Sequence, residues 1–260
     1  MGISLVVGLQ ATILLLSFLY LKIATPINWS SIREEGGWPG WGLPSMFLRL
    51  YLLHASLIGF LIAAASHPSI NTPLLLGKKP DGTFPIWSML LFSPFLIFIR
   101  IYAFAKKYKR KTESGFTQVA EGLYVGRWPS LCDGNLPADD PAIIDCTCEL
   151  PRSSSVLRNS PYICVPTWDT RSPSPEGIES AVRWACGKRA QNKPVYIHCA
   201  FGHGRSVCVT CAVMVAMGKA EDWKIAEKMV KEKRPFIRMN ALHRANLEDW
   251  SKRRSILTKN

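Results

Sequence analysis

The sequence predicts an α/β domain that follows about three transmembrane helices. Three long apolar stretches occupy the first 105 residues, and an ordinary charged sequence begins at residue 106. In this second part short β-branched runs alternate with helical patterns, which predicts a parallel sheet with helices on both faces. We therefore expect a membrane domain over residues 1–105, a basic juxtamembrane linker over 106–117 and the α/β domain over 118–260.

The apolar stretches cover roughly residues 3–21, 45–66 and 85–105. The first is long enough, at about 1.5 Å per residue, to cross most of a bilayer core, and it lacks the basic start of a removed signal peptide. The second carries small residues at four-residue spacing, which favours close helix packing in lipid. Five basic residues between 106 and 111 follow the third stretch, so the positive-inside rule predicts that the C-terminal domain faces the cytosol.

The net charge and the cysteine content of the sequence limit which cellular compartment and which classes of partner we expect. The chain has a net charge of +13, and residues 106–260 carry +10 of it, from 26 Lys and Arg against 16 Asp and Glu. This excess favours anionic lipid headgroups or phosphorylated substrates, or serves only as a soluble surface. All eight cysteines follow residue 131 without the spacing of a small disulfide framework, which indicates a reducing compartment. Cys208 and Cys211 have the spacing of a zinc or redox half-site, but within an apolar helix they are better explained by core packing. We predict no metal, no cofactor and no nucleic-acid partner, and we leave the oligomeric state open.

The α/β part can be divided into elements. Short β-branched or aromatic runs predict strands at 120–127, 142–146, 162–165 and 195–197. Helical patterns predict helices at 175–189, 206–217, 221–233 and 240–253. We expect the strand at 195–197 to be central, and it leads directly into a glycine-containing loop.

This loop carries the chemistry. It runs from His198 and Cys199 to Arg205, and Ser206 opens the next helix. Backbone N–H groups at a helix N-terminus stabilise a thiolate and hold phosphate oxygens, while an arginine grips two oxygens at once. Glycines permit the tight curl that such a cradle needs. The pattern predicts Cys199 as the nucleophile, Arg205 and Ser206 as its catalytic partners, and a phosphate-binding loop made of His198, Ala200, Phe201, Gly202, His203 and Gly204.

The pattern His-Cys-x5-Arg-Ser at residues 198–206 resembles the signature of the cysteine-based protein tyrosine and dual-specificity phosphatases. The segment Lys-Arg-Pro-Phe-Ile-Arg-Met-Asn-Ala-Leu-His at 233–243 is similar to the region that follows the loop in that family. The resemblance covers roughly residues 118–252. It implies a hydrolase of phosphoric monoesters that works through a cysteinyl-phosphate.

The resemblance also implies roles for residues outside the loop. Family members place a catalytic aspartate about thirty residues before the cysteine, and Asp169 matches that position. A leaving alkoxide needs a proton, so this residue has to act as an acid. The charge of nearby Arg171 is expected to favour the ionised carboxylate instead. Asn240 and His243 are implied to position the hydrolytic water, or else they only cap the last helix.

The sequence is compatible with more than one class of substrate. None of Ala200, Phe201 and His203 is Lys or Arg, whereas family members that act on highly charged inositol lipids tend to carry basic loop residues. The resemblance therefore favours phosphoproteins, with dual-specificity or tyrosine-type activity. The membrane anchor and the basic domain favour a phospholipid or phosphoinositide. A non-catalytic phosphate-binding scaffold is a further alternative.

Overall fold

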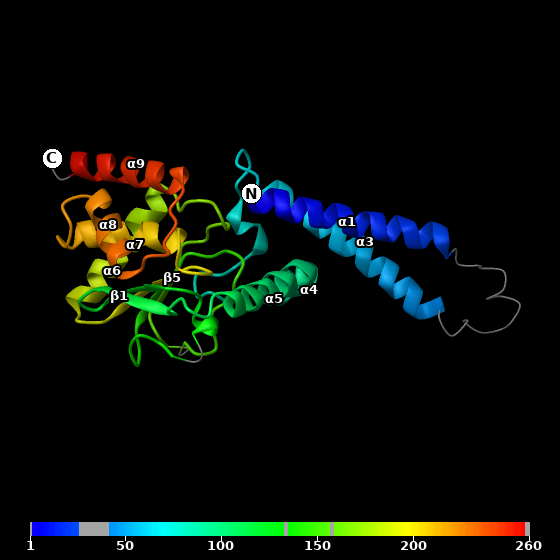
Figure 1. The fold of residues 1–260 in the computed structure, drawn as a ribbon, viewed down its shortest axis with the longest axis horizontal. Coiled ribbons are helices and arrows are strands. Elements are labelled where there is room, and N and C mark those ends of the chain that lie inside the picture. Colours follow the sequence, from blue (N-terminus) through cyan, green and yellow to red (C-terminus); the bar gives the residue numbers. More distant parts are fainter. Residues whose placement is uncertain (1, 26–41, 133–134, 157–158, 258–260) are drawn as a thin grey trace, which may run out of the picture. The chain divides into compact units, whose positions relative to one another are not determined.

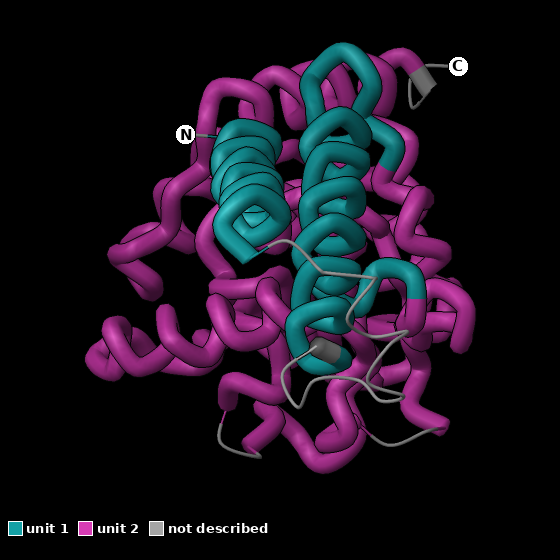
Figure 2. The backbone as a smooth tube through the Cα atoms, turned by 90° about the vertical axis from the view of Figure 1, so that its right-hand side faces the viewer, with its two compact units in different colours: residues 1–72, 91–95 teal, residues 73–90, 96–260 magenta. Residues whose placement is uncertain are grey.

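The structure is a computed structural model, and it describes residues 2–25, 42–132, 135–156 and 159–257. The chain forms two compact units, which Figure 2 colours separately. Residues 1–72 and 91–95 make the first unit, and residues 73–90 and 96–260 make the second. The division lies before the boundary expected near residue 105, because residues 73–90 and most of the following helix pack within the second unit.

Two apolar helices form the first unit. α1 (Ile3–Ala24) and α3 (Gly42–Ala65) lie side by side (Figure 1). They approach closely at small residues, since a Cβ added to Gly59 would lie 2.7 Å from the Cβ of Ala11. The hydroxyl of Ser56 donates to the Ala11 carbonyl at 3.0 Å. Both helices are long and apolar enough to cross a membrane, by length and composition.

The prediction of a third span at 85–105 is wrong. This stretch divides into α4 (Ile86–Leu91) and α5 (Ser93–Lys109), and among the described residues only α1 and α3 meet the criteria for a span. Pro94 explains the break, because proline has no backbone N–H and its ring clashes with the carbonyl of the preceding turn. α5 then continues through Lys109, so the first part of the expected linker at 106–117 is helical.

A mixed five-stranded sheet in the order β1-β2-β5-β3-β4 forms the centre of the second unit. β5 (Val195–His198) lies in the middle, as predicted, and is parallel to β2 (Leu123–Gly126) and β3 (Ala142–Asp145). β4 (Tyr162–Cys164) is parallel to β3. The prediction of a wholly parallel sheet is wrong at one edge, where β1 (Phe116–Ala120) pairs antiparallel with β2. The strand expected at 120–127 is part of this hairpin, which turns at Gly122 with φ +64°.

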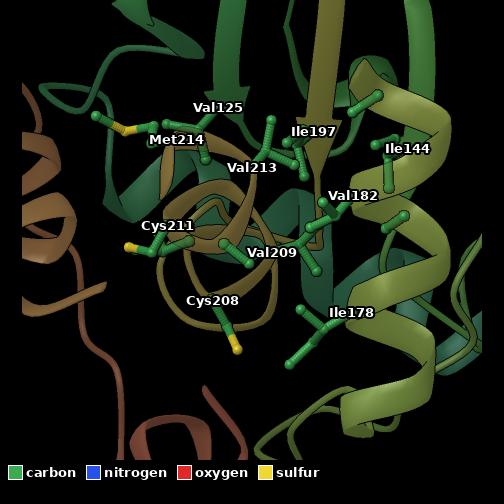
Figure 3. Close-up of a cluster of buried hydrophobic side chains, with 14 of the residues drawn as sticks. Val125, Ile144, Ile178, Val182, Ile197, Cys208, Val209, Cys211, Val213 and Met214 are labelled. Carbon is green, nitrogen blue, oxygen red and sulfur yellow. The ribbon is translucent and has the colours of Figure 1, made fainter. Parts of the chain in front are cut away.

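Four helices cover one face of the sheet: α6 (Pro175–Ala190), α7 (Arg205–Ala216), α8 (Trp223–Lys233) and α9 (Ala241–Leu257) (Figure 1). Figure 3 shows how side chains of α6 and α7 meet those of the strands, with Ile178, Val182, Val209 and Val213 near Val125, Ile144 and Ile197. The alternate strand residues Ile143 and Tyr196 face the other way. There, loop residues such as Val156 and Leu136 cover them, so the expected helices on both faces are not found in the described part of the chain.

α5 and the segment before α4 belong to the same unit as the sheet. Ala103 of α5 packs with Trp128, Leu150 and Ala200, which follow β2, β3 and β5. Lys78, just after the short 3₁₀ helix η1 (Pro73–Leu76), is buried and forms an ion pair of 2.5 Å with Asp145 at the end of β3. These contacts place two segments from the predicted membrane part against the carboxyl end of the sheet.

Candidate active site

The loop after β5 curls at the carboxyl end of the central strand and enters α7. Gly202 adopts a φ of +71°, and a Cβ there would lie 2.5 Å from the carbonyl carbon of Gly126. Only glycine fits this position without moving the backbone. Arg234 fixes the same turn, because its Nε and Nη2 donate to the carbonyls of Gly202 and Phe201 at 3.0 and 3.2 Å.

The thiol of Cys199 is buried at the start of α7. Its Sγ accepts hydrogen bonds from the Gly202 amide at 3.2 Å and from the Ser206 hydroxyl at 3.3 Å. Burial alone would raise the pKa of Cys199, but the charge of Arg205 and the hydrogen bonds from Ser206 outweigh it and lower that pKa. The arrangement therefore favours a thiolate, which is the nucleophilic form of cysteine.

The guanidinium of Arg205 is paired with Glu149, a residue that the sequence did not indicate. Its guanidinium donates to both carboxylate oxygens of Glu149, at 2.9 and 3.1 Å, and to the Thr167 carbonyl at 2.7 Å. Burial would lower the pKa of Arg205, yet Glu149 and the other negative groups keep it well above its ordinary value. Glu149 lies in the loop after β3, fifty-six positions before Arg205. No local pattern marks it, because the two residues meet only through the strand order.

Asp169 lies on the rim of the site. Its Oδ1 accepts a hydrogen bond from Arg205 Nη2 at 3.1 Å, and 41% of its side chain is exposed. Arg205 of the loop is therefore a cationic partner of Asp169, a contact that the sequence did not indicate. The structure thus places the four residues predicted for catalysis around one site, with Asp169 and Arg205 beside Cys199 and the Ser206 hydroxyl behind the sulfur.

The residues between Cys199 and Arg205 have different surroundings. Phe201, His203 and Gly204 line the cavity, and Ala200 is buried with its carbonyl accepting from the Trp128 amide at 3.2 Å. His198 does not line the cavity, so its inclusion among the phosphate-binding residues is not supported by its position. Burial lowers the pKa of His198 to about 4, although Asp145 opposes the shift. A neutral, enclosed ring beside Tyr196 supports the strand end.

His203 connects the loop to the segment after α5. Burial, opposed by Glu113, lowers the pKa of His203 to about 4, so the ring is neutral. Its Nδ1 accepts from Arg110 at 2.8 Å and its Nε2 donates to Glu113 at 2.7 Å. The guanidinium of Arg110 also lies over the Phe201 ring, 5.2 Å from its centroid. Residues of the expected linker therefore form part of the site.

Asn240 and His243 meet at the start of α9. The Asn240 side-chain oxygen accepts from the His243 amide at 2.9 Å, which confirms the helix cap, and its Nδ2 donates to the Thr170 carbonyl at 2.9 Å. His243 Nδ1 accepts from the Asn240 amide at 3.2 Å, so the proton of the neutral ring is on Nε2. That Nε2 is buried without a protein partner among the described residues. It is a donor available to a bound group.

These residues enclose a cavity of about 310 Å³. Its floor is Cys199 and Arg205, and its walls come from four segments of the second unit. The lining residues are Tyr102, Lys106, Arg110, Asp169, Thr170, Cys199, Phe201, His203, Gly204, Arg205, Arg238, Asn240 and His243. In the part of the chain that the structure describes, no group of three His, Cys, Asp or Glu side chains is arranged to hold a metal ion. Thiolate, guanidinium and an acid around one small cavity suit a phosphate monoester.

The comparison with known families supports this interpretation. Residues 138–253 match the catalytic domain of the dual-specificity phosphatases. The matched residues include Glu149, Asp169, the loop around Cys199 and both Asn240 and His243, whereas β1, β2 and α5 precede the match. No curated protein matches the chain.

Several solved structures are similar to part of this chain. PTPMT1 in complex with PI(5)P aligns with a TM-score of 0.48 at 16% identity, over 56% of this chain and 99% of that one. Tk-PTP in its active form aligns with a TM-score of 0.46 at 23% identity, over 54% and 97%. Human DUSP28 aligns with a TM-score of 0.44 at 16% identity, over 54% and 95%.

Proposed function

We propose that this chain is a membrane-anchored phosphomonoesterase that works through a cysteinyl-phosphate on Cys199. The observation that carries the proposal is the environment of the Cys199 sulfur, where a buried thiol has a lowered pKa beside Arg205 and Ser206. A cysteine that serves only to pack in the core does not need a stabilised thiolate, and burial in apolar surroundings raises its pKa. The other buried cysteines of the domain, such as Cys146 and Cys208, indeed have raised pKa values, with burial as the first cause.

In the first step the thiolate attacks phosphorus and the ester P–O bond breaks. Arg205 and the backbone N–H groups of the loop hold the equatorial oxygens as charge redistributes. The leaving oxygen needs a proton, and Asp169 supplies it from the cavity rim. In the structure Asp169 is bonded to Arg205, so it has to release that contact and bind a proton before this step.

In the second step water attacks the phosphorus of the thiophosphate and the S–P bond breaks. Asp169, now ionised, takes the proton from this water, and the Ser206 hydroxyl stabilises the departing thiolate. We assign Asn240 and His243 to the placement of this water, since the unpartnered His243 Nε2 is a donor at the cavity. Inorganic phosphate then leaves and the thiolate is regenerated.

The substrate class has two candidates within this mechanism. An uncharged loop sequence, with Ala200 and Phe201 after the cysteine, favours a phosphoprotein and hence dual-specificity or tyrosine-type activity. The basic residues on the cavity wall, Lys106, Arg110 and Arg238, favour a more highly charged substrate such as a phospholipid headgroup. These three basic residues lie outside the loop of residues 198–206.

We further propose that α1 and α3 anchor the chain in a membrane with the phosphatase domain on its cytosolic side. The apolar character of both helices supports the anchor. The cluster of basic residues at 106–111 supports the orientation, because such clusters favour the cytosolic surface.

The direct test uses the full chain in detergent micelles with p-nitrophenyl phosphate, phosphotyrosine and phosphoserine peptides, and phosphoinositides. We expect phosphate release from at least one of them, and its loss in the variant Cys199→Ser with substrate binding retained. A preparation that binds phosphorylated ligands but turns over none of them would identify a scaffold instead. Turnover that survives Cys199→Ser would contradict the mechanism.

A further inference from the structure

The wall of the candidate active site holds more positive charge than one phosphate monoester needs. Arg205 already faces Glu149 and Asp169, and Arg110 is engaged with His203. Lys106 of α5 and Arg238, which precedes α9, also line the cavity. Neither has a carboxylate within 4.0 Å among the described residues, and the amino group of Lys106 only lies near the Tyr102 ring, at 5.4 Å from its centroid. Two uncompensated cations on the wall of so small a cavity attract a second anionic group.

We propose that Lys106 and Arg238 form an anion subsite for the phosphodiester of a phospholipid whose headgroup also carries the reactive phosphate monoester. The inference rests on the proposed function, because it takes the monoester to be bound by Arg205 at Cys199. The monoester then occupies the loop, and the second phosphate group contacts the two remaining cations. Charge-assisted contacts of this kind are about twice as strong as neutral hydrogen bonds.

The surface of α5 indicates that the second phosphate belongs to a lipid. Ile97, Ile101, Phe104 and Tyr108 recur at helical spacing, and each of these side chains is about half exposed or more, from 49% to 72%. At 3.6 residues per turn they form one stripe, whereas Tyr102, Lys106 and Arg110 form a different stripe that lines the cavity. An exposed apolar stripe on a helix that ends in basic residues is typical of a segment at a bilayer surface.

The helix that precedes α5 also exposes apolar side chains. Ile86 and Leu90 of α4 are 73% and 69% exposed. A lipid that stays in the bilayer would therefore lie next to α5, with its headgroup near the cavity. A phosphopeptide with a second phosphate offers the same charge, but it gives no reason for an exposed apolar stripe on the helix that lines the cavity.

This assignment explains why the loop itself is poor in positive charge. Residues 138–253 match the phosphatase family, and Lys106 lies before that region. The selectivity for a second anionic group would come from a helix added to the family domain, together with Arg238. The sequence of the loop alone therefore does not indicate this selectivity.

The experiment compares substrates that differ in the second phosphate. The full chain in non-ionic detergent micelles is given phosphatidylinositol monophosphate, which has a monoester and a diester, and phosphatidic acid, which has the monoester alone. The variant is Lys106→Gln with Arg238→Gln. The matched control is Lys109→Gln with Lys231→Gln, which removes the same charge from exposed residues that do not line the cavity.

We expect the ratio of kcat/KM for phosphatidylinositol monophosphate to that for phosphatidic acid to fall by about tenfold or more in the variant, mainly through KM. The control pair should keep the wild-type ratio. The charge-preserving pair Lys106→Arg with Arg238→Lys should restore most of it, which separates the effect from misfolding.

An unchanged ratio in a variant that still hydrolyses p-nitrophenyl phosphate would overturn the subsite while leaving the phosphatase intact. The lipid assignment would be overturned if the variant lost selectivity for a doubly over a singly phosphorylated peptide and not for the lipid pair. Absence of all turnover by the wild type would instead reject the proposed function on which the subsite rests.

Discussion

The carboxylate of Glu149 binds the guanidinium of Arg205 through two hydrogen bonds, at 2.9 and 3.1 Å, and both side chains are buried. Such a bidentate pair fixes the plane of the guanidinium. The orientation of Arg205 toward a phosphate at Cys199 therefore depends on a residue of the β3 loop.

Glu149→Gln should lower kcat/KM for p-nitrophenyl phosphate by about 10- to 100-fold, because one charge-assisted contact of Arg205 is lost. The same change removes a negative charge near the loop, so the pKa of Cys199 should fall further. Iodoacetamide alkylation against pH measures this pKa independently of turnover. Glu121→Gln, at an exposed turn, is the matched control. Unchanged turnover would show that Arg205 is positioned by other groups.

Asp169→Asn should lower kcat by about 10²- to 10⁴-fold on alkyl phosphates, since it removes the general acid. The loss should be smaller on p-nitrophenyl phosphate, because that leaving group needs less protonation. The dependence of kcat on leaving-group pKa measures this difference, and Asp139→Asn is an exposed control. Equal losses on both kinds of substrate would assign Asp169 to binding instead of proton transfer.

Ser206→Ala removes the hydroxyl that donates to Cys199 Sγ. The pKa of Cys199 is lowered in the fold, so the thiolate persists as the pH falls below the usual thiol range. In the variant the alkylation profile should move to higher pH, because one of the stabilising donors is lost. Breakdown of the cysteinyl-phosphate should slow by about 10- to 100-fold, which appears as a burst of product. An unmoved profile, with Ser180→Ala as reference, would contradict this role.

Lys78→Met should destabilise the second unit by about 3–5 kcal/mol, because it leaves the Asp145 carboxylate buried without its cation. Burial would then dominate and raise the pKa of Asp145, which Lys78 now holds low. A carboxyl group with a raised pKa in the folded state opposes folding as the pH rises, so the destabilisation should be smaller in acid than at neutral pH.

Thermal unfolding of the full chain at several pH values tests this expectation, with exposed Lys79→Met as the control. A loss of stability that is the same at every pH would mean that Asp145 does not carry the effect. Equal stability of Lys78→Met and the wild type would show that residues 73–90 are not an essential part of the domain.

The loop residues of the site were predicted from their local spacing, and Asp169 was predicted from the family resemblance, whereas Glu149 was not predicted. Cys199, Gly202, Arg205 and Ser206 lie within eight residues, so their types and spacing were sufficient to predict a phosphate loop. Glu149 has no such signature, because the pairing of β3 with β5 brings it to Arg205.

The fold shows the same distinction. Alternating strands and helices predicted a parallel sheet with β5 at its centre, and four of the five strands follow that pattern. The antiparallel β1 overlaps the expected linker at 106–117, although Phe116, Thr117 and Val119 are residue types common in strands and Gly122 makes the hairpin turn. Hydropathy alone could not distinguish a third span from α4 and α5, since Pro94 and the packing of Ala103 decide that difference.

The central claim is that phosphate is transferred to the Cys199 sulfur, and the most direct test is rapid acid quenching of the full chain during turnover, followed by mass spectrometry of its peptides. We expect one phosphate on the peptide that contains Cys199, accumulating further in Ser206→Ala and absent from Cys199→Ser. Turnover without any phosphorylated cysteine, or with the phosphate on another residue, would contradict the account.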